Sequence, residues 1–472
     1  MNDRRAKIIC TLGPASDSTT VVKKLINAGM NVARINFSHG DHETNGRQID
    51  LVNSCANQLG KYVGILMDLK GPKIRVGKFE GGVAHFKKGD KTCALMEEVE
   101  GNHDRFTIRQ KELFNDVKDG DTLLVDDGKV ILKILKAYPD KMELEVQNDG
   151  DISDNKGINA PGVVLSMPFV SEKDKKDLLF GIRKGVNMVA CSFVRRAQDV
   201  LDIRQILNDN GGKDIEVIAK IENQEGVDNI ESIIDVADGI MVARGDMGVE
   251  LPLEDVPVYQ KMIIKKCNEK GKPVITATHM LESMIHCPRP TRAEAGDVAN
   301  AILDGTDATM LSGESAAGEY PEIAVKTMSS IISKIETVSN FEQTFDRVSK
   351  HANQSINDAI GLSIASCCMS LDRAKAIFAF TETGGTAKRI SHFRPSLPIY
   401  ACTEYDRTCQ KLSYYWGVYP IKVKKADYFL EFDEIARSEA IKLGYKKGDI
   451  IILASGFGVA HGQTNTVRLL VL

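Results

Sequence analysis

The sequence predicts an α/β fold: a (β/α)8 TIM barrel with an inserted small β-barrel lid domain and a C-terminal open-sheet α/β domain. Three observations support this prediction. Short apolar, β-type runs alternate with helical patterns through most of the first 345 residues. The alternation breaks once, for a stretch rich in turn signals. It then resumes in a separate block that begins near residue 351.

Eight short runs rich in β-branched and apolar residues are the expected barrel strands. Each is followed by polar or Gly-rich residues and then by a helical pattern, and this alternation is typical of parallel α/β folds. A count of eight favours a closed barrel over an open sheet. The runs cover residues 7–12, 32–37, 63–69, 188–193, 216–222, 239–246, 273–278 and 308–312. The last helix of the set is expected at residues 321–336, because Pro321 suits a first helical position and apolar residues recur at helical spacing.

The break in the alternation falls after the third expected strand. Turn signals recur there, as in Gly89-Asp90, Asp126-Asp-Gly128 and Asp149-Gly-Asp151. Their density predicts a small antiparallel β domain. An insertion in a βα loop lies at the end of the barrel where active sites are found, so it is well placed to act as a lid. We assign residues 1–70 and 163–345 to the barrel, 71–162 to the lid and 346–472 to the C-terminal domain.

The C-terminal block shows the βα rhythm of a second, open sheet. Its expected strands cover residues 374–380, 397–402, 418–423, 449–454 and 467–471. Helical patterns are clear near residues 355–370 and 433–443.

Composition excludes several classes of protein. The chain has 472 residues with a formal net charge of −4, which gives no electrostatic case for binding nucleic acid. No stretch approaches the ~20 apolar residues that span a bilayer, so no membrane association is expected. The charged start, Met1-Asn-Asp-Arg-Arg-Ala-Lys7, does not resemble a signal peptide. Ten cysteines are scattered without a Cys-x-x-Cys pair, so we expect reduced thiols in a cytoplasmic protein.

Charged side chains end two consecutive strands. Lys220 and Glu222 are two residues apart in one expected strand and therefore point to the same face. Asp246, at the end of the next expected strand, would join them if the strands are neighbours. Two carboxylates suit Mg²⁺, and a lysine beside it can neutralise charge on a transferring phosphoryl group. The alternative is a solvated ion pair at a strand end.

Polar side chains also end the second strand. Strict alternation places Arg34, Asn36 and Ser38 on one face, and His39 follows. A guanidinium with amide and hydroxyl groups suits phosphate oxygens. The alternative is a polar edge strand. The neighbouring strand ends carry similar chemistry in Thr11-Leu-Gly-Pro14 and Asp68-Leu-Lys-Gly-Pro-Lys-Ile-Arg75, which favours the phosphate interpretation.

Hydroxyl groups end the last two strands of the expected barrel. Thr276 and Thr278 are expected on one face of the seventh strand, and Leu311-Ser-Gly-Glu-Ser315 ends the eighth. Such hydroxyls could orient a substrate carboxylate or a proton-relay water. Each alone is more often a helix cap or a turn residue.

Together these stretches resemble pyruvate kinase of the bacterial type. The similarity runs over essentially the whole chain in the family's order. The matching stretches are Lys7-Ile-Ile-Cys-Thr-Leu-Gly-Pro-Ala-Ser16, Asn31-Val-Ala-Arg-Ile-Asn-Phe-Ser-His-Gly40, Met67-Asp-Leu-Lys-Gly-Pro-Lys-Ile-Arg75, Lys156-Gly-Ile-Asn-Ala-Pro-Gly162, Ile218-Ala-Lys-Ile-Glu-Asn223, Ala243-Arg-Gly-Asp-Met-Gly248, Ala277-Thr-His-Met-Leu-Glu-Ser-Met284 and Met310-Leu-Ser-Gly-Glu-Ser315.

The resemblance implies Mg²⁺-dependent transfer of a phosphoryl group from phosphoenolpyruvate to ADP, giving ATP and pyruvate, usually by a homotetramer; Mn²⁺ could replace Mg²⁺. It implies that Glu222 and Asp246 bind the metal. Lys220 and Arg34 would contact the phosphoryl group. The backbone of Gly245 and Asp246, together with Thr278, would bind the carboxylate, and Thr278 would orient the protonating water. The nucleotide would contact Asn36, Ser38, His39, Arg75 and, from the lid, Lys156.

The chain departs from the potassium-dependent members at two positions. Those enzymes have Thr and Glu where this chain has Leu69 and Lys73, and they bind K⁺ through oxygens at the positions of Asn36, Ser38, Asp68 and Leu69. A lysine next to a carboxylate such as Asp68 stays protonated near neutral pH. We therefore expect Lys73 to replace K⁺ and the enzyme to need no added K⁺.

A second phosphate site is expected in the C-terminal domain. Thr381-Glu-Thr-Gly-Gly-Thr386 joins an expected strand to a helix beginning near Ala387. Hydroxyls and free N–H groups before a helix suit an anion. The loop matches the family's effector loop, so Thr381, Thr383, Gly384, Gly385 and Thr386 are candidates for a phosphorylated activator, either a sugar phosphate or AMP. Lys388 and Arg389 follow, but they could simply face water.

Two other functional classes stay open at this stage. A metal-dependent barrel lyase acting on pyruvate or phosphoenolpyruvate would also place Glu and Asp on Mg²⁺, but it needs no nucleotide and no lid lysine. A non-catalytic homologue acting as a scaffold is the other alternative. His279 stands where many members carry Gln, and a supporting hydrogen-bonding role is favoured for it over direct catalysis.

Overall fold

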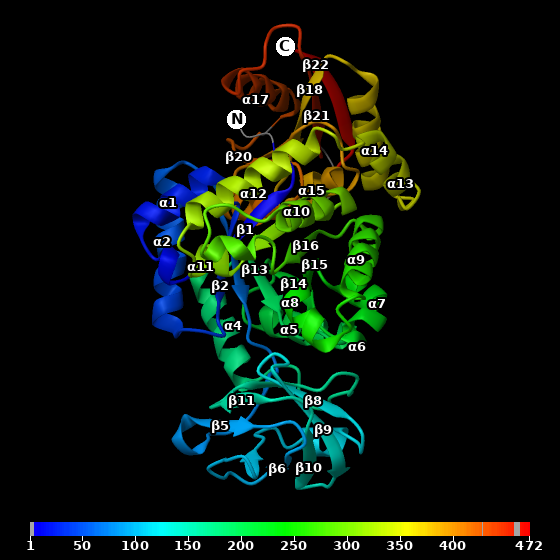
Figure 1. The fold of residues 1–472 in the computed structure, drawn as a ribbon. Coiled ribbons are helices and arrows are strands. Elements are labelled where there is room, and N and C mark those ends of the chain that lie inside the picture. The colour runs from blue at the N-terminus through cyan, green and yellow to red at the C-terminus, as the bar shows by residue number, and fades with distance from the viewer. Residues whose placement is uncertain (1–3, 427, 457–462) are drawn as a thin grey trace.

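The computed structural model describes residues 4–426, 428–456 and 463–472, and it confirms the predicted fold class (Figure 1). Eight parallel strands close into a barrel in the order β1-β17-β16-β15-β14-β13-β3-β2. Their bounds are β1 Lys7–Thr11, β2 Val32–Asn36, β3 Gly64–Asp68, β13 Met188–Cys191, β14 Glu216–Ile221, β15 Gly239–Ala243, β16 Val274–Ala277 and β17 Ala308–Leu311. Each lies within a run expected to form a barrel strand.

Helices surround the barrel because the outward faces of its strands are apolar and must be covered. Residues such as Ile35, Val189 and Val242 pack against the helical layer and are fully or almost fully buried. The main helices are α1 Thr19–Ala28, α2 His42–Gln58, α4 Glu172–Lys184, α5 Ala197–Asp209, α7 Ile230–Val236, α9 Val256–Lys270, α10 Arg292–Asp304 and α12 Pro321–Glu336. Shorter helical segments are α6 Gln224–Asp228, α8 Arg244–Glu250, α11 Gly313–Ala316 and the 3₁₀ turns Pro14–Ser16 and Glu282–Ile285.

Local signals fix several helix ends. Ser171 and Thr291 cap the starts of α4 and α10, each with an acidic residue at the third position completing a capping box. Gly185 ends α4 in a left-handed conformation with φ of 70°. Helix α12 occupies the predicted residues 321–336, with Pro321 at its first position.

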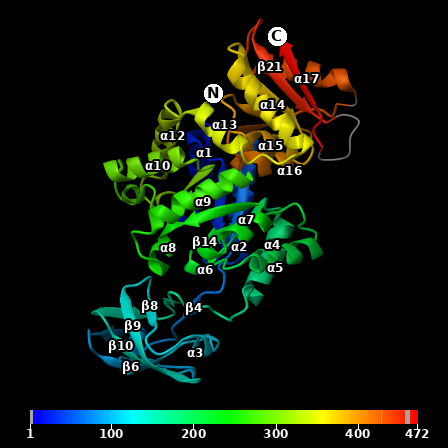
Figure 2. The ribbon, with the colours of Figure 1, turned by 90° about the vertical axis from the view of Figure 1, so that its right-hand side faces the viewer.

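The lid is inserted between β3 and α4, and it lies at the carboxyl end of the barrel strands, away from the C-terminal domain (Figure 2). It contains β4 Ile74–Arg75, β5 Val83–Phe86, β6 Lys91–Leu95, β7 Arg105–Thr107, β8 Thr122–Val125, β9 Val130–Ala137, β10 Lys141–Val146, β11 Gly150–Ser153, β12 Gly157–Asn159, the helix α3 Leu113–Asp116 and the turn Glu80–Gly82. Seven strands form one sheet, and β5 pairs with β11.

The lid sheet curls around its own core. A bridge between Val76 and Ile108 joins the ends of β4 and β7, which are the two edges of the seven-stranded sheet. The strands are antiparallel as expected, except that β6 and β7 run parallel. On β10, Met142, Leu144 and Val146 alternate inward, which is the period-2 pattern of a strand with one buried face.

The C-terminal domain is a five-stranded open sheet in the order β20-β19-β18-β21-β22, in which β22 is antiparallel to β21. Its strands are β18 Ala374–Phe380, β19 Ile399–Thr403, β20 Val418–Lys422, β21 Ile450–Ser455 and β22 Thr466–Val471. Its helices are α13 Phe341–Ser349, α14 Ile356–Ser370, α15 Gly385–His392, α16 Asp406–Lys411 and α17 Phe429–Lys442, with the turn Leu412–Tyr414.

This domain packs on the amino ends of the barrel strands. Lys7 Nζ, on the first residue of β1, donates to the carbonyl oxygen of Val418 at 2.6 Å. The limits of the three domains stay a proposal at the boundaries given above, and the proposed limit between residues 345 and 346 falls within α13. No helix within the described residues is long and apolar enough to cross a membrane. All ten cysteines lie in the described part of the chain, and each is a free thiol there.

Candidate active site

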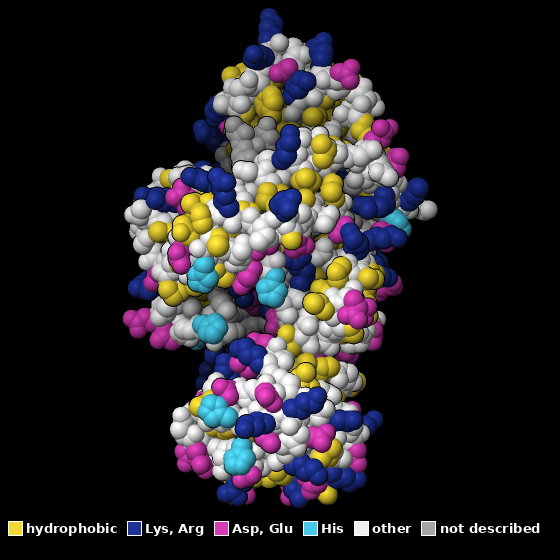
Figure 3. Space-filling model, in the orientation of Figure 1, with side chains coloured by type: hydrophobic (Ala, Val, Ile, Leu, Met, Phe, Trp, Pro, Cys, Tyr) yellow, Lys and Arg dark blue, Asp and Glu magenta, His cyan; other side chains and the backbone are white. Residues whose placement is uncertain are grey.

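The predicted catalytic side chains lie at or just beyond the carboxyl ends of neighbouring barrel strands. Lys220 is on β14, Asp68 ends β3 and Arg34 is on β2, and β3 and β2 are hydrogen-bonded neighbours. Glu222 follows the last residue of β14. Figure 3 shows charged side chains gathered where the surface narrows between the barrel and the lid.

Lys220 is the centre of a buried charged cluster. Its Nζ lies 2.9 Å from Glu222 Oε1 and 3.3 Å from Asp68 Oδ1, and it donates to Ser192 Oγ at 2.7 Å. Burial alone lowers the pKa of this ammonium, but the carboxylates of Asp68, Glu222 and Asp246 outweigh that effect and hold the pKa above its usual value. Lys220 is therefore a permanent positive charge at neutral pH.

Asp68 holds a second cation beside the first. Arg34 Nε donates to Asp68 Oδ2 at 2.6 Å, and Arg34 Nη1 donates to Thr11 Oγ1 at 2.9 Å. Burial raises the pKa of Asp68, but Lys220 and Arg34 together lower it below its usual value. One carboxylate thus fixes a guanidinium and an ammonium on opposite sides of itself. Sequence reasoning named Asp68 for K⁺ and within a strand end of phosphate-type chemistry, and it did not name Ser192 at all.

Glu222 is fully buried and has an oxygen available for a metal ion. Its Oε2 accepts the N–H of Phe193 at 2.5 Å. Its Oε1 has no hydrogen-bond donor in good geometry among the described residues, although the ammonium of Lys220 is close. Burial raises the pKa of Glu222 to about 7; the charge of Lys220 opposes this rise, and that of Asp246 adds to it. A buried carboxylate in these surroundings favours a bound cation.

Asp246 is the second carboxylate, but it is not on a strand as predicted. Strand β15 ends at Ala243, and Asp246 lies in the first turn of α8. An acidic side chain is favourable there, because the first turn of a helix carries a partial positive charge. Within the described residues, no group of three or more His, Cys, Asp or Glu side chains could hold a metal. Two carboxylates fit Mg²⁺, which takes its other oxygens from water or substrate.

Thr278 lies beyond β16 in a left-handed backbone conformation with φ of 68°, so the predicted shared strand face with Thr276 is wrong. Thr276 is buried, and its hydroxyl donates to Thr306 Oγ1. The unusual conformation of Thr278 is supported by its contacts with α8. Its Oγ1 accepts the N–H of Gly245 at 2.7 Å, and its carbonyl oxygen accepts from Arg244 Nη2 at 2.6 Å.

Arg244 is a residue that sequence reasoning quoted but did not use. Besides Thr278, it pairs with Asp297 on α10 at 2.7 Å. It therefore ties the start of α8 to the loop after β16. His279 also lies beside the start of α8, because a β-carbon added to Gly245 would be 3.4 Å from Cε1 of His279.

The predicted nucleotide residues fall into two groups. On the barrel, β2 ends at Asn36, and Asn36 Oδ1 accepts the N–H of Ser38 at 3.0 Å in the turn that also contains His39. Ser38 is therefore not on the strand as expected. On the lid, Arg75 Nη1 donates to the carbonyl oxygen of Asn155 at 2.7 Å, next to Lys156. Among the described residues, no hydrogen bond or ion pair joins the two groups.

Lys73 does not pair with Asp68 as we expected. Its Nζ lies 3.6 Å from Asp127 Oδ1 in the lid. The physical reason is that both oxygens of Asp68 are already engaged by Arg34 and Lys220. The Leu69 side chain is buried in the barrel core, and its carbonyl oxygen accepts from Ser192 Oγ at 2.9 Å.

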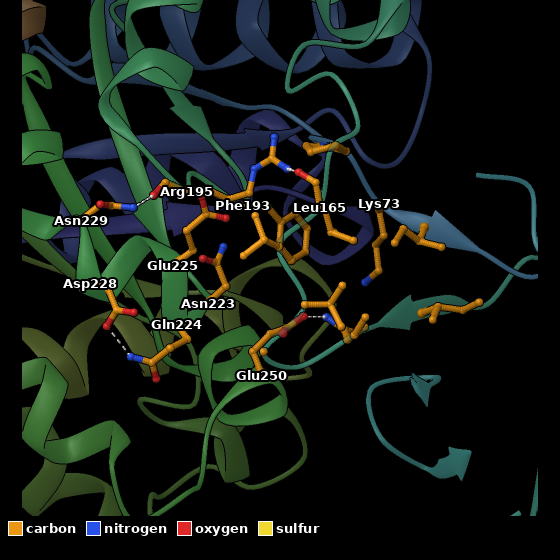
Figure 4. A pocket seen from close by; sticks show the side chains of 18 residues that line it. Lys73, Leu165, Phe193, Arg195, Asn223, Gln224, Glu225, Asp228, Asn229 and Glu250 are labelled. Carbon is orange, nitrogen blue, oxygen red and sulfur yellow. Dashed lines mark hydrogen bonds between the residues drawn. The ribbon is translucent and has the colours of Figure 1, made fainter. Parts of the chain in front are cut away.

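A cavity of about 370 Å³ separates the base of the lid from the barrel (Figure 4). Lys73, Asn159 and the segment 162–165 line it from the lid side, and Phe193, Asn223 and Glu250 line it from the barrel. Asn159 Nδ2 donates across it to Glu250 Oε1 at 2.6 Å. The lid thus contacts the last residue of α8, the helix that carries Asp246.

The C-terminal loop lines a second cavity, of about 350 Å³. Thr381, Thr383, Gly385 and Thr386 line it, and so do Lys424 and Lys425, which sequence reasoning missed. Gly384 has φ of +100°, and its N–H donates to Thr381 Oγ1 at 3.0 Å. Helix α15 begins at Gly385, two residues before the expected start. The cavity therefore combines hydroxyls, a helix start and two lysines.

Comparison with known proteins agrees with this geometry. The family model described as pyruvate kinase, barrel domain, matches residues 3–325, and the one described as pyruvate kinase, alpha/beta domain, matches residues 358–470. A pyruvate kinase from Bacillus licheniformis is 48% identical over 472 residues, covering 99% of this chain and 80% of the relative. One from Clostridium acetobutylicum is 46% identical and covers 99% of this chain and 100% of the relative.

A solved structure agrees as well. The crystal structure of a pyruvate kinase from Cryptosporidium parvum superposes with a TM-score of 0.95 at 37% identity, covering 99% of this chain and 96% of that one. With both family models and near-full-length relatives in agreement, the chain belongs to the pyruvate kinase family of phosphotransferases.

Proposed function

We propose that the chain transfers the phosphoryl group of phosphoenolpyruvate to ADP, giving ATP and enolpyruvate, which is then protonated to pyruvate. The observation that carries this proposal is the Lys220 ammonium, which lies between the carboxylates of Asp68 and Glu222. Arg34 pairs with the carboxylate of Asp68. Phosphoryl transfer asks a protein mainly for positioning and charge neutralisation, and this cluster is suited to both.

Each residue of the cluster has a role in the proposal. Lys220 and Arg34 neutralise the phosphoryl group during transfer. Glu222 and Asp246 would hold Mg²⁺, or Mn²⁺ in its place, which neutralises further charge on the substrate oxygens. The N–H groups of Gly245 and Asp246 in the first turn of α8 would receive the substrate carboxylate.

Thr278 links carboxylate binding to protonation. In the structure the Gly245 N–H donates to Thr278 Oγ1, and the Thr278 hydroxyl donates to the carbonyl oxygen of Ala277 at 2.6 Å. A carboxylate arriving there would compete for the Gly245 N–H. The hydroxyl would then turn from Ala277 toward the site and orient the carboxylate and the water that protonates enolpyruvate. Asn36, Ser38 and His39 on the barrel and Arg75 and Lys156 on the lid would contact ADP, which requires the two groups to approach each other as the lid closes.

One assay tests the proposal against its alternatives. Pyruvate and ATP should form from phosphoenolpyruvate only when ADP and Mg²⁺ are both present. A pyruvate-type product without ADP would indicate the lyase. The absence of any turnover would indicate the scaffold. Either result would reject the proposal.

We also propose that catalysis needs no added K⁺. The support is that Lys73 places an amine on the cavity between the lid and the barrel, although it pairs with Asp127 rather than Asp68. Steady-state rates in buffer free of Na⁺ and K⁺ should match those with K⁺ within about twofold, because an ammonium already fills the cationic role. A stimulation by K⁺ of about tenfold or more would contradict this, since it corresponds to about 1.4 kcal/mol of cation-dependent stabilisation.

The cavity at the loop 381–386 is our proposed activator site. A sugar phosphate or AMP would place its phosphate at the start of α15, where free N–H groups and hydroxyls meet Lys424 and Lys425. A homotetramer and a cytoplasmic location complete the proposal, and both rest on the resemblance to the family.

Thr383→Glu should abolish activation while leaving the maximal rate at saturating phosphoenolpyruvate unchanged. Thr383 is exposed and lines the cavity, so a carboxylate there repels a phosphate without disturbing the fold. Activation is measured with ribose 5-phosphate and AMP as probes. Ser366→Glu, an exposed change on α14 of the same domain, is the control and should be activated normally. Unchanged activation of Thr383→Glu would count against the site.

A further inference from the structure

A second, largely buried charged cluster lies at the opposite end of β14. Glu216, Lys388, Tyr414 and Tyr415 form it, and we call it the Glu216 cluster. Glu216 is the first residue of β14, Lys388 belongs to α15, and the tyrosines precede β20. One barrel residue is therefore enclosed by three residues of the C-terminal domain. None of the four takes part in the proposed chemistry.

Both oxygens of Glu216 are fully engaged. Lys388 Nζ forms an ion pair with Oε1, to which Tyr415 also donates at 3.0 Å. Tyr414 donates to Oε2 at 2.5 Å. Burial alone lowers the pKa of Lys388, but Glu216 outweighs it and raises the pKa above its usual value. The cluster is thus an ion pair supported by two tyrosine hydroxyls. The Lys388 side chain, which is 28% exposed, contacts Glu216 instead of lying free in water as the sequence allowed.

A buried ion pair of this kind is weak support for stability by itself. Two charges lose their hydration on burial, and replacing both by apolar groups of similar volume is often neutral or stabilising. Removing only one of them leaves the other charge buried and unpaired, which is destabilising. The place of this pair in the fold is more informative than its energy. Lys388 lies within the first turns of α15, and α15 starts at the proposed activator loop. Glu216 lies four residues before Lys220 on one continuous strand.

The strand between them transmits position because it cannot bend freely. Strand β14 is hydrogen-bonded to β13 on one side and to β15 on the other, and all six of its residues are buried. A shift of α15 therefore moves Glu216, and through the strand it changes the placement of Lys220 and Glu222 against their partners. Packed elements of this kind respond as units.

We infer that Glu216 and Lys388 are positioning residues, which couple the placement of α15 to the catalytic end of β14. The inference deepens the proposed function and rests on its assignment of Lys220 and of the activator loop. By linkage, an anion at the loop and a ligand at the active site must then affect each other's binding by the same factor.

The chain carries an internal reporter for this coupling. Trp416 is the single tryptophan, is buried, and follows Tyr415 directly. Its carbonyl oxygen accepts from Ser391 Oγ of α15 at 2.6 Å. Its fluorescence therefore reports on the interface at the Glu216 cluster, far along the chain from the residues that bind substrate.

The test compares the wild type with the double variant Glu216→Gln/Lys388→Met, which removes both charges and so leaves neither one stranded. Lys7→Met is the matched control. Lys7 is also the buried first residue of a barrel strand and also contacts the C-terminal domain, but it contacts β20 instead of α15. Thermal unfolding checks that all three proteins fold.

In the first arm, Mg²⁺ and oxalate are bound at the active site and the emission of Trp416 is measured, with binding itself checked by calorimetry. The emission should change in the wild type and in Lys7→Met but not in the double variant, although oxalate still binds. In the second arm, ribose 5-phosphate should lower the KM for phosphoenolpyruvate by about fivefold or more in the wild type and the control, at the lower end of typical couplings, and by less than about twofold in the double variant.

The two arms separate the possible failures. A double variant with the wild-type emission change and the wild-type shift in KM would overturn the inference. So would a wild type whose emission does not respond to bound oxalate, since linkage is reciprocal. A wild type that responds to oxalate but to no phosphorylated probe would leave the coupling standing and would reject the activator loop. A lack of oxalate binding would reject the proposed active site, and the inference with it.

Discussion

Replacing Lys220 with Met should lower turnover by ~10²–10³ or more, the effect of losing one preorganised electrostatic group aimed at developing charge. The ammonium is buried, contacts Asp68, Glu222 and Ser192, and is held in its charged form by the carboxylates around it. Methionine keeps much of the side-chain volume and removes only the charge and its donors. Steady-state rates at saturating phosphoenolpyruvate, ADP and Mg²⁺ measure the loss.

Lys265→Met provides the control for this variant. Lys265 is an exposed residue of barrel helix α9, where its Nζ lies 3.9 Å from Glu269 Oε1, and among the described residues no hydrogen bond or ion pair joins it to the Lys220 cluster. Its rate should stay within about threefold of the wild type, since surface ion pairs contribute little. A Lys220→Met enzyme within that same range would remove Lys220 from the mechanism.

Glu222→Gln should weaken the apparent affinity for Mg²⁺ by about tenfold or more and lower turnover by ~10²–10³, since it removes one of two charged metal ligands. The change keeps the shape of the side chain and can still accept the N–H of Phe193. Metal affinity is measured by titrating Mg²⁺, and then Mn²⁺, in the assay and by calorimetry without substrate.

Glu225→Gln is the matched control, because it is the same chemical change three residues further along, on a side chain that lines the neighbouring cavity. It should leave metal affinity within about twofold of the wild type, as expected for a charge that does not contact the ion. Equal metal affinity in the Glu222→Gln and wild-type enzymes would show that the metal is held elsewhere.

The fold was predictable because its signals are local and repeated. Short runs that are mostly apolar and fully buried, such as 64–68, alternate with helical patterns eight times, and few architectures bury strands on both faces in this way. Pro321 and the apolar stripe after it were enough to predict α12 from its first to its last residue. The parallel pairing of β6 with β7 was missed, because turn signals indicate only that strands are short and closely connected.

Side-chain positions in the site were predictable where they follow from the two-residue period of a strand. They were not predictable where they depend on the backbone conformation of the loop or helix after the strand. The two-residue spacing of Lys220 and Glu222 places them on one side of β14, and the structure puts them 2.9 Å apart. Asp246 and Thr278 were expected on strands. Instead, Asp246 lies in the first turn of α8, and Thr278 lies after β16 in a left-handed backbone conformation. Nothing in a hydrophobic pattern marks either feature.

Contacts between distant segments were the least predictable. Lys73 pairs with Asp127 inside the lid, and Lys388 pairs with Glu216 across the interface between the C-terminal domain and the barrel. In both cases the partner is set by tertiary packing of segments that are distant in the sequence. The sequence around Lys388 has the pattern of a helix start near a loop, which gives no sign that the side chain pairs with a residue of a barrel strand. Lys424 and Lys425 were missed because they lie about 40 residues further along the chain than the loop 381–386, and only the fold of the C-terminal domain brings them to the same cavity.

A crystal structure with Mg²⁺ and oxalate bound tests the central assignment most directly. Oxalate is a planar dianion that resembles the enolate of pyruvate. The account predicts one Mg²⁺ with oxygens of Glu222 and Asp246 at ~2.0–2.1 Å, oxalate completing its coordination, and Lys220 Nζ beside the oxalate. A metal ion bound without these two carboxylates, or an oxalate out of reach of Lys220, would contradict it.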